Sequence, residues 1–379
     1  MRYTLFLAGI CSAAAAAFAQ TPALTGSMFH PYEIKPQGRL VLNSGSLTFD
    51  TDAATVSGSV SGLRSTNGVL GISQSTNVEL AVFCFNKIDL GSNVAVTVQG
   101  RRGLVLLSRS DLCLDTTIDV SATEPDPSDR YIPGRGGPGA EGGTNGVGFN
   151  SAPPPSDGGD GGPGGRDGKP NTAGVGYGAA PHVGKTSDGG GGGYGGAGGA
   201  GSGAGGVDYG MSSLEDLLGG SGGAGGHGGG HPSALGAGGG GGAVELVSAQ
   251  NIVLGPEAEI LADGSDGFGG SEVGSGGGSG GGILLAAQRI ICAAGATVSA
   301  QGGDGAIVPP RKGAGGGGGG RIAFYSKDDY GAPGEGDETG LPAYVTVSGG
   351  TGRNNGQDGS FYDGPDSPVR PPGLVMIVF

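Results

Sequence analysis

Short segments of alternating apolar and polar residues recur in a fixed order along this chain. Such alternation predicts β-strands with one buried face. Each copy holds three short strands within roughly 20 residues, a period typical of stacked repeats. The expected inward-facing pairs are Leu104/Leu106, Leu112/Leu114 and Ile118/Val120, then Val244/Leu246, Ile252/Leu254 and Ile260/Ala262, then Ile283/Leu285, Ile291/Ala293 and Val298/Ala300. Ile88, Leu90, Val94, Val96 and Val98 form an earlier partial copy, and Ile322 and Phe324 begin a later one.

The repeated order of the strands predicts an all-β fold. We expect a right-handed parallel β-helix, a solenoid with three faces per rung and rungs stacked about 4.8 Å apart. Stacking would bury aliphatic side chains that no single rung could bury alone. An antiparallel β-sandwich is the alternative, because alternation by itself fits both folds. The similar strand order in each copy favours the β-helix.

Glycine changes this picture, because it makes up 93 of the 379 residues. Glycine-rich runs at 236–242, 276–282 and 315–320 each come directly before a rung with a clear apolar pattern. A far longer glycine-rich stretch occupies residues 121–242. One interpretation of that stretch is a flexible linker. The other, which we favour, is an ordered insert of polyglycine-II-like strands packed on the solenoid. Its anchors would be Tyr194, Tyr209, Leu214, Leu217 and Leu218.

An ordered insert carries two further expectations. The strands of Leu104–Val120 should lie beside those of Val244–Ala262, although more than a hundred residues separate them. Within the insert, Met211–Leu218 is the one segment that could form a short helix, capped by Ser212 or Ser213.

The remaining segments predict a secreted protein. Residues 1–19 have a basic start, an apolar stretch and the A-x-A site Ala17-Phe18-Ala19, as in a cleaved signal peptide. No later stretch has the ~20 apolar residues of a membrane span. The expected organisation is a signal peptide at 1–19, an extended lead-in at 20–38, N-terminal rungs at 39–120, the glycine-rich insert at 121–242, C-terminal rungs at 243–326, and an acidic, Pro-rich cap at 327–379. Tyr344–Val347 and Leu374–Phe379 would be closing strands of that cap.

These features together resemble a known class of proteins. The segments GGGGGAVELVSAQNIVLG, GGGSGGGILLAAQRIICAAGATVSAQGGDG and GGGGGGRIAFYS follow the glycine-rich insert. They resemble secreted glycine-rich surface proteins with the pectin-lyase-like β-helix pattern, over about residues 80–326. The resemblance rests on repeats and not on catalytic signatures, so it implies a fold and an extracellular place more than an activity.

The net charge of the chain limits the classes of partner that we expect. The formal net charge is −14 with a pI near 4.6, which disfavours a nucleic-acid partner. The Asp-Gly turns at 264–267 and 302–305 occupy equivalent places, and Asp157, Asp160 and Asp167 lie in the insert. Stacked turns of this kind could collect oxygen ligands for calcium. Asp-Gly is also a common turn, so we expect no cofactor and keep calcium as the alternative.

No catalytic set emerges from the motifs. Enzymes with this fold use Asp together with Arg, Lys or His on one sheet face, and the nearest candidates are Arg101, Arg102, Arg109, Asp111 and Asp115. No paired aspartates stand beside a histidine in a strand. His227 and His231 could share a metal, but no third ligand is near, and solvated loop histidines are the simpler interpretation.

The cysteines suggest one disulfide. Loss of Cys11 with the signal peptide leaves Cys84, Cys113 and Cys292 in an oxidising compartment. Our alignment puts Cys113 and Cys292 in one column but not on adjacent rungs. It puts Cys84 and Cys113 on neighbouring rungs, so Cys84–Cys113 is the expected pair.

The sequence thus favours a secreted, non-enzymatic structural or adhesive protein of a cell surface or matrix. Its expected partners are extracellular polysaccharides or cell-surface components. The alternative is a polysaccharide-binding or polysaccharide-degrading β-helix protein, which would need an open face lined by Asp with Arg or Tyr. A weaker third hypothesis is binding to ice or mineral surfaces.

Overall fold

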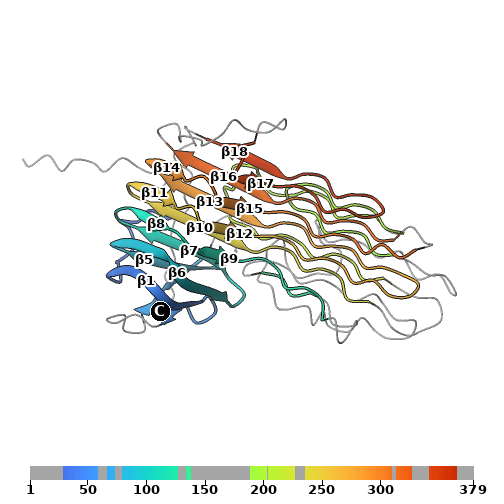
Figure 1. Cartoon of the computed structure of the whole chain (residues 1–379), viewed down its shortest axis with the longest axis horizontal. Coiled ribbons are helices and arrows are strands. Elements are labelled where there is room, and N and C mark those ends of the chain that lie inside the picture. Colours follow the sequence, from blue (N-terminus) through green and yellow to red (C-terminus); the bar gives the residue numbers. More distant parts are fainter. Residues whose placement is uncertain are drawn as a thin grey trace, which may run out of the picture.

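The computed structural model shows a stack of β-strands continued on one side by long, nearly parallel extended segments (Figure 1). The described residues are 29–58, 66–72, 79–126, 134–137, 188–202, 204–226, 235–309, 313–326 and 341–364. Every regular element within these ranges is a β-strand, and the described residues include no helix. The predicted signal peptide and the predicted closing strand Leu374–Phe379 lie outside them.

The strands form three sheets. Sheet A has the order β14-β11-β8-β6-β1-β2-β3, sheet B the order β18-β16-β13-β10-β7-β5-β4, and sheet C the order β17-β15-β12-β9. The strands of sheet A are β1 (Arg39–Asp50), β2 (Thr55–Gly58), β3 (Thr66–Asn67), β6 (Lys87–Gln99), β8 (Leu112–Leu114), β11 (Asn251–Leu254) and β14 (Arg289–Cys292). Those of sheet B are β4 (Val69–Ile72), β5 (Glu79–Phe85), β7 (Gly103–Ser108), β10 (Ala243–Ser248), β13 (Gly282–Ala287), β16 (Arg321–Ser326) and β18 (Ser360–Asp363). Those of sheet C are β9 (Thr117–Asp119), β12 (Glu259–Leu261), β15 (Thr297–Ser299) and β17 (Val345–Thr346).

Most strand pairs are parallel, and these join equivalent strands of successive modules. One module is a strand of sheet B followed along the chain by one of sheet A and one of sheet C, as in β7-β8-β9, β10-β11-β12 and β13-β14-β15. Antiparallel pairs occur where β2, β3 and β4 join the sheets at the N-terminal side of the stack. The sequence-based expectation of parallel strands in an all-β fold is confirmed.

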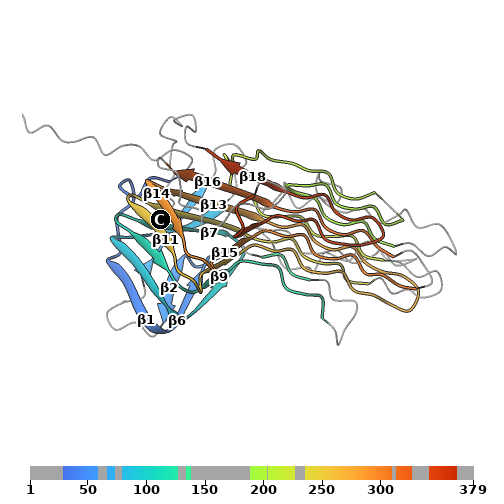
Figure 2. The same ribbon diagram turned by 45° about the horizontal axis from the view of Figure 1, so that its top comes forward.

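The insert interrupts the chain but not the stack. Strand β10 pairs with β7, β11 with β8, and β12 with β9, with Val244 opposite Leu104 and Ile260 opposite Ile118. The prediction that Leu104–Val120 lies beside Val244–Ala262 is therefore confirmed. Figure 2 shows the same continuity, with the teal and yellow strands as neighbours.

A central core fills the space between the three sheets. Nearly all of the predicted inward pairs belong to it, as do Leu40, Leu47, Phe49 and Phe83 from the N-terminal strands. The pair Ile291/Ala293 was predicted wrongly: Ile290 and Cys292 face the core, and Ile291 is exposed. Only Gln288 separates β13 from β14, whereas two residues separate β10 from β11. Loss of one residue at this corner shifts the strand by one position and so reverses its faces.

The central strands of sheet B are buried on both faces. All six residues of β7, β10, β13 and β16 are buried. Their outer face packs against the insert in an outer cluster that includes Tyr194, Leu214, Leu217 and Leu218, with Tyr209 partly buried at its rim. The predicted anchoring of the insert by these five residues is confirmed.

The predicted helix at Met211–Leu218 is wrong. Leu214 has a φ of +48° and its amide donates to the carbonyl of Met211, so the segment folds as a turn. A helix cannot continue through a left-handed residue. The side chains of Leu214, Leu217 and Leu218 reach the outer cluster from this turn.

The glycine-rich segments form an ordered bundle with a three-residue repeat. Residues 276–281 donate backbone hydrogen bonds in turn to 221–224, 315–318 and 262–265, so that positions three apart bond the same neighbour. Residues 315–320 do the same with 189–192, 354–357 and 300–303. A helix with three residues per turn points successive amides in three directions, as in polyproline-II geometry.

Close approach explains why these segments are glycine. A Cβ added at Gly317 would overlap the carbonyl oxygen of Gly278, and one at Gly278 would overlap that of Gly239. Side chains return at three-residue intervals on the outside of the bundle, as at Gln301, Asp304 and Ile307, which are exposed. The same period therefore sets both the glycine interior and the side-chain surface.

Candidate functional surface

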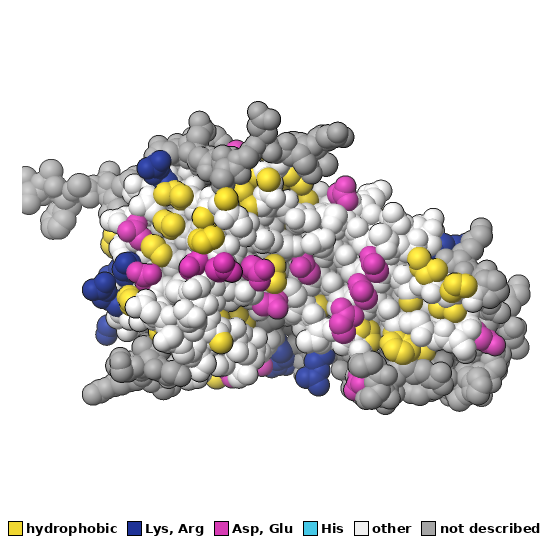
Figure 3. Space-filling model, in the orientation of Figure 1, with side chains coloured by type: hydrophobic (Ala, Val, Ile, Leu, Met, Phe, Trp, Pro, Cys, Tyr) yellow, Lys and Arg dark blue, Asp and Glu magenta, His cyan; other side chains and the backbone are white. Residues whose placement is uncertain are grey.

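A regular arrangement of polar side chains lies where the bundle leaves sheet C. Four segments, 121–124, 263–266, 301–304 and 348–351, run side by side there and are joined by backbone hydrogen bonds. We call the side chains at their ends the acidic array: Ser121, Asp263, Gln301 and Ser348 in one column, and Glu124, Asp266, Asp304 and Thr351 in the other. A band of carboxylates crosses this part of the molecule in Figure 3.

Side chains of the second column link each segment to the next. Glu124 Oε1 accepts the amide of Asp266 at 3.3 Å, Asp266 Oδ1 that of Asp304 at 2.6 Å, and Asp304 Oδ1 that of Thr351 at 2.6 Å. Each carboxylate is thereby fixed by the segment beside it and keeps a second oxygen. The column is a row of oriented acceptors about 4.8 Å apart, the spacing of neighbouring strands.

The first column is tied together in the same way. The amide of Asp263 donates to Ser121 Oγ at 3.0 Å, and Asp263 Oδ1 accepts from the amide of Gln301 at 2.6 Å and from Ser299 Oγ at 2.7 Å. Ser348 Oγ donates to Gln301 Oε1 at 3.0 Å. Both columns are therefore held rigid by contacts between modules.

Two carboxyl groups of the array have raised pKa values. Burial is the main cause at Asp263, and the negative charge of Asp119 adds to it, although the bonds from Gln301 and Ser299 act in the opposite direction on this pKa. Burial also raises the pKa of Glu124, with a smaller contribution from the charge of Asp266. Removing a carboxylate from water disfavours its charged form.

The two Asp-Gly turns considered for calcium do stack. The amide of Gly267 donates to the carbonyl of Asp304, and the two aspartates belong to the same column of the array. Among the described residues, no three His, Cys, Asp or Glu side chains are grouped as metal ligands. Asp157, Asp160 and Asp167, and the pair His227 and His231, lie outside these residues.

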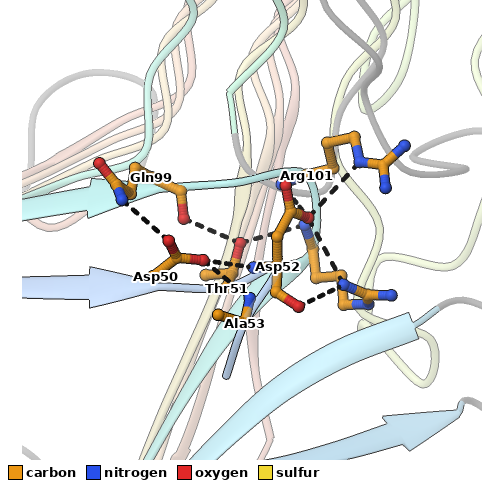
Figure 4. Close-up of polar contacts among 7 residues, drawn as sticks. Asp50, Thr51, Asp52, Ala53, Gln99 and Arg101 are labelled. Carbon is orange, nitrogen blue, oxygen red and sulfur yellow. Dashed lines mark hydrogen bonds and ion pairs between the residues drawn. The ribbon is translucent and has the colours of Figure 1, made fainter. Parts of the chain in front are cut away.

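The arginines first considered as catalytic hold the N-terminal modules together. Asp52 Oδ1 accepts the amide of Arg101 at 3.0 Å and lies 3.5 Å and 3.4 Å from the guanidinium groups of Arg101 and Arg102 (Figure 4). Beside it, Asp50 accepts from the amide of Ala53 at 2.8 Å, and this bond is the main cause of its lowered pKa. The network joins the turn after β1 to the turn after β6.

Arg109, Asp111 and Asp115 also have structural partners. Arg109 donates to the carbonyls of Pro31 and Ile34, which fixes the lead-in segment over sheet B. Asp111 accepts from Asn251 Nδ2 at 2.8 Å, and Asp115 accepts the amide of Glu257 at 3.0 Å. The structure thus disperses these candidates over separate contacts and assembles no catalytic group from them.

The predicted disulfide is absent, because Cys84, Cys113 and Cys292 are all free thiols. Cys84 lies in sheet B opposite Leu107, whereas Cys113 lies in sheet A between Asp89 and Val253. The column shared by Cys113 and Cys292 is also wrong, because Cys292 is opposite Leu254 and faces the core. Burial raises the pKa of Cys292 to about 12.

Arg321 is a functional residue of the scaffold that the sequence did not reveal. Its side chain is buried in the outer face of sheet B, donates to the carbonyls of Tyr209 and Tyr194, and lies 5.6 Å from the centre of the Tyr194 ring. It also donates to Ser360 Oγ at 2.9 Å. The one available signal was an arginine that opens a strand directly after six glycines.

No helix among the described residues is long and apolar enough to cross a bilayer. Comparisons of the chain with protein-family models, curated proteins and solved structures give no match.

Proposed function

We propose that this protein is a secreted, non-enzymatic structural or adhesive component of a cell surface or extracellular matrix. Its fold in this proposal is a right-handed parallel β-helix with a polyglycine-II-like bundle as the glycine-rich insert. The parallel pairing of equivalent strands in three sheets and the three-residue period of the bundle support that fold. The apolar start of the chain and its A-x-A site support secretion.

The observation that carries the adhesive role is the acidic array. Its acceptors are fixed at regular spacings on a rigid scaffold, so they need little ordering when they meet a repeating surface. Repeated weak contacts that form together yield strong overall attachment. Extracellular polysaccharides and other cell-surface components present repeating hydroxyl or amine donors that such acceptors can bind.

The enzymatic alternative requires an open face that combines carboxylates with Arg or Tyr. The outer face of sheet B does combine Glu245, Arg321 and Tyr325, but the insert and the lead-in segment cover it and all three side chains are buried. Substrate could not reach them without displacement of the hydrogen-bonded bundle. This coverage favours the structural proposal over the enzymatic one.

Sedimentation of the purified full-length chain with insoluble cellulose, chitin and chitosan particles tests the proposal. The variant Asp266→Asn/Asp304→Asn keeps one acceptor oxygen, Oδ1, at each position and removes two charges from the array. The control Asp89→Asn/Asp208→Asn makes the same change of charge on other surfaces. We expect the wild type and the control to sediment with at least one polymer, and the array variant several-fold less.

Two results would contradict the proposal. One is equal sedimentation of the array variant and the control. The other is release of soluble sugars by the wild type that stops when a single aspartate is replaced, because that result would identify an enzyme.

A further inference from the structure

A polar hollow of about 280 Å³ lies at the corner between sheets A and C, on the same side of the stack as sheet C. Ser92, Thr117, Pro256, Glu257 and Glu259 line it, together with Gly295. These residues belong to four successive modules, so the hollow runs along the stack and not around it. It is separate from the acidic array, whose residues follow the strands of sheet C in each module.

Unequal turns create the hollow. Two residues, 115 and 116, join β8 to β9, whereas four residues join β11 to β12 and another four join β14 to β15. In the module before these, β6 passes the corner as one continuous strand. The longer turns therefore project beyond the shorter one, and Pro256 and Glu257 form a ledge above Thr117 and Ser92.

The ledge is fixed in place. Asp115 Oδ1 accepts the amide of Glu257 at 3.0 Å from below. The backbone at Gly255 approaches the same carboxylate so closely that a Cβ there would overlap it. Gly295, with a φ of +103°, brings the next turn against the carbonyl of Pro256. The hollow is thus a preformed feature of the backbone.

Its lining selects for hydrogen-bond donors with positive charge. Thr117 Oγ1 donates to Glu259 Oε2 at 2.9 Å, which orients this carboxylate and leaves its other oxygen to accept. Glu257 and Glu259 are both exposed to the hollow, and none of its lining residues is Lys, Arg or His. Two carboxylates without a cation favour an ammonium group, and the hydroxyls of Ser92 and Thr117 suit neighbouring sugar hydroxyls.

We propose that this corner hollow binds one amine-bearing sugar unit of an extracellular polysaccharide. The volume lies just below the usual range of about 300–1,000 Å³ for ligand pockets and suits a single sugar ring. Because its lining comes from four successive modules, an extended polymer would lie along the stack. This inference rests on the adhesive function proposed above and names the partner for it.

Titration calorimetry of the full-length chain with a glucosamine trimer tests the proposal, with the N-acetylated trimer as a neutral comparison. We expect the amine form to bind at least about tenfold more tightly, as the gain of one charge-assisted hydrogen bond predicts. Glu257→Gln/Glu259→Gln should lose that difference. Ser92→Phe should weaken both trimers by filling the hollow without a change of charge.

The matched control is Asp89→Asn/Asp208→Asn, which removes two charges elsewhere on the surface and leaves both the hollow and the array intact. Binding that falls equally in this control and in the glutamate variant would overturn the hollow as the site, because it would show only general charge attraction. Equal affinity for the two trimers would overturn the choice of an amine. If the trimer does not bind at the hollow but sedimentation still depends on the array, the hollow proposal fails and the adhesive function stands. If the chain binds no polymer at all, both proposals fail.

Discussion

At the scale of single residues, the bundle depends on glycines, because they have no Cβ atom. Interior glycines such as Gly278 and Gly317 bring backbones together until no Cβ fits between them, and each backbone then bonds several neighbours. Glycine pays the largest ordering entropy of any residue, so this lattice forms only because its hydrogen bonds and contacts are shared among many strands. Composition alone could not distinguish the lattice from a linker, because both are rich in glycine.

Gly317→Ala should be strongly destabilising. Its Cβ would overlap the carbonyl oxygen of Gly278 inside the lattice, and overpacking of this kind costs about 1–3 kcal/mol. Ala200→Ser is the control, because position 200 is partly exposed on the outside of the bundle. Thermal unfolding should show a clearly lower Tm for Gly317→Ala and a nearly unchanged one for Ala200→Ser. Equal Tm values would show that the close packing is not real.

Asp263→Asn should change how stability depends on pH. Burial raises the pKa of Asp263 in the folded chain, so ionisation opposes folding, and this cost is present above the folded pKa. The cost disappears as the pH falls through the raised pKa toward the ordinary value near 3.8. The Tm of the variant relative to the wild type should therefore be highest at pH 7 and decline toward pH 4. A difference that grows as the pH falls would contradict the raised pKa.

At the scale of elements, the sequence predicted the strands well and their corners poorly. Alternation identified β7 to β13 and most of their inward residues, because each strand is buried on the core side. It misplaced Ile291 because a single residue is lost before β14, and a local pattern does not show at which corner the loss occurs. The sequence predicted that the insert packs on the strands, but the alternation did not show that it covers the outer face of sheet B.

The acidic array shows the same division between what sequence can and cannot predict. The equivalence of the turns containing Asp266 and Asp304 was visible as a repeat of Asp-Gly. Their bonds to the amides of the next segment were not, because these depend on the register between segments from different modules. Repeat spacing thus located candidate positions, and the stack determined their partners.

Arg321 joins strand β16 to the glycine-rich insert, and replacing it should make the insert less stable. Arg321→Met removes the bonds to the carbonyls of Tyr209 and Tyr194 while keeping a long apolar side chain. Loss of several buried bonds to a charged group should cost about 3 kcal/mol. Hydrogen exchange should become faster in residues 188–209, which the arginine anchors, and remain slow in β10 and β13. Faster exchange in the strands but not in the insert would contradict the anchoring role.

At the scale of the whole molecule, the insert completes the protein. Strands β7, β10, β13 and β16 would expose their outer apolar face without it, and the segments at 276–281 and 315–320 would lose hydrogen-bond partners in 188–226. The stack supplies the surface on which the glycine segments order, and the glycine segments cover the stack. We therefore expect the two parts to fold as a single cooperative unit.

Replacing residues 138–234 by a short Gly-Ser linker tests this cooperation. The shortened chain would keep every strand of the three sheets but expose Leu107, Val247, Leu284 and Ala323 on one side. An exposed apolar sheet face of that size promotes association. Light scattering after size-exclusion chromatography should show oligomers or aggregates, and a dye that binds apolar surface should fluoresce more strongly than with the full chain. A monomeric, cooperatively unfolding product would show instead that the strand stack is stable alone and that the bundle is an appended element.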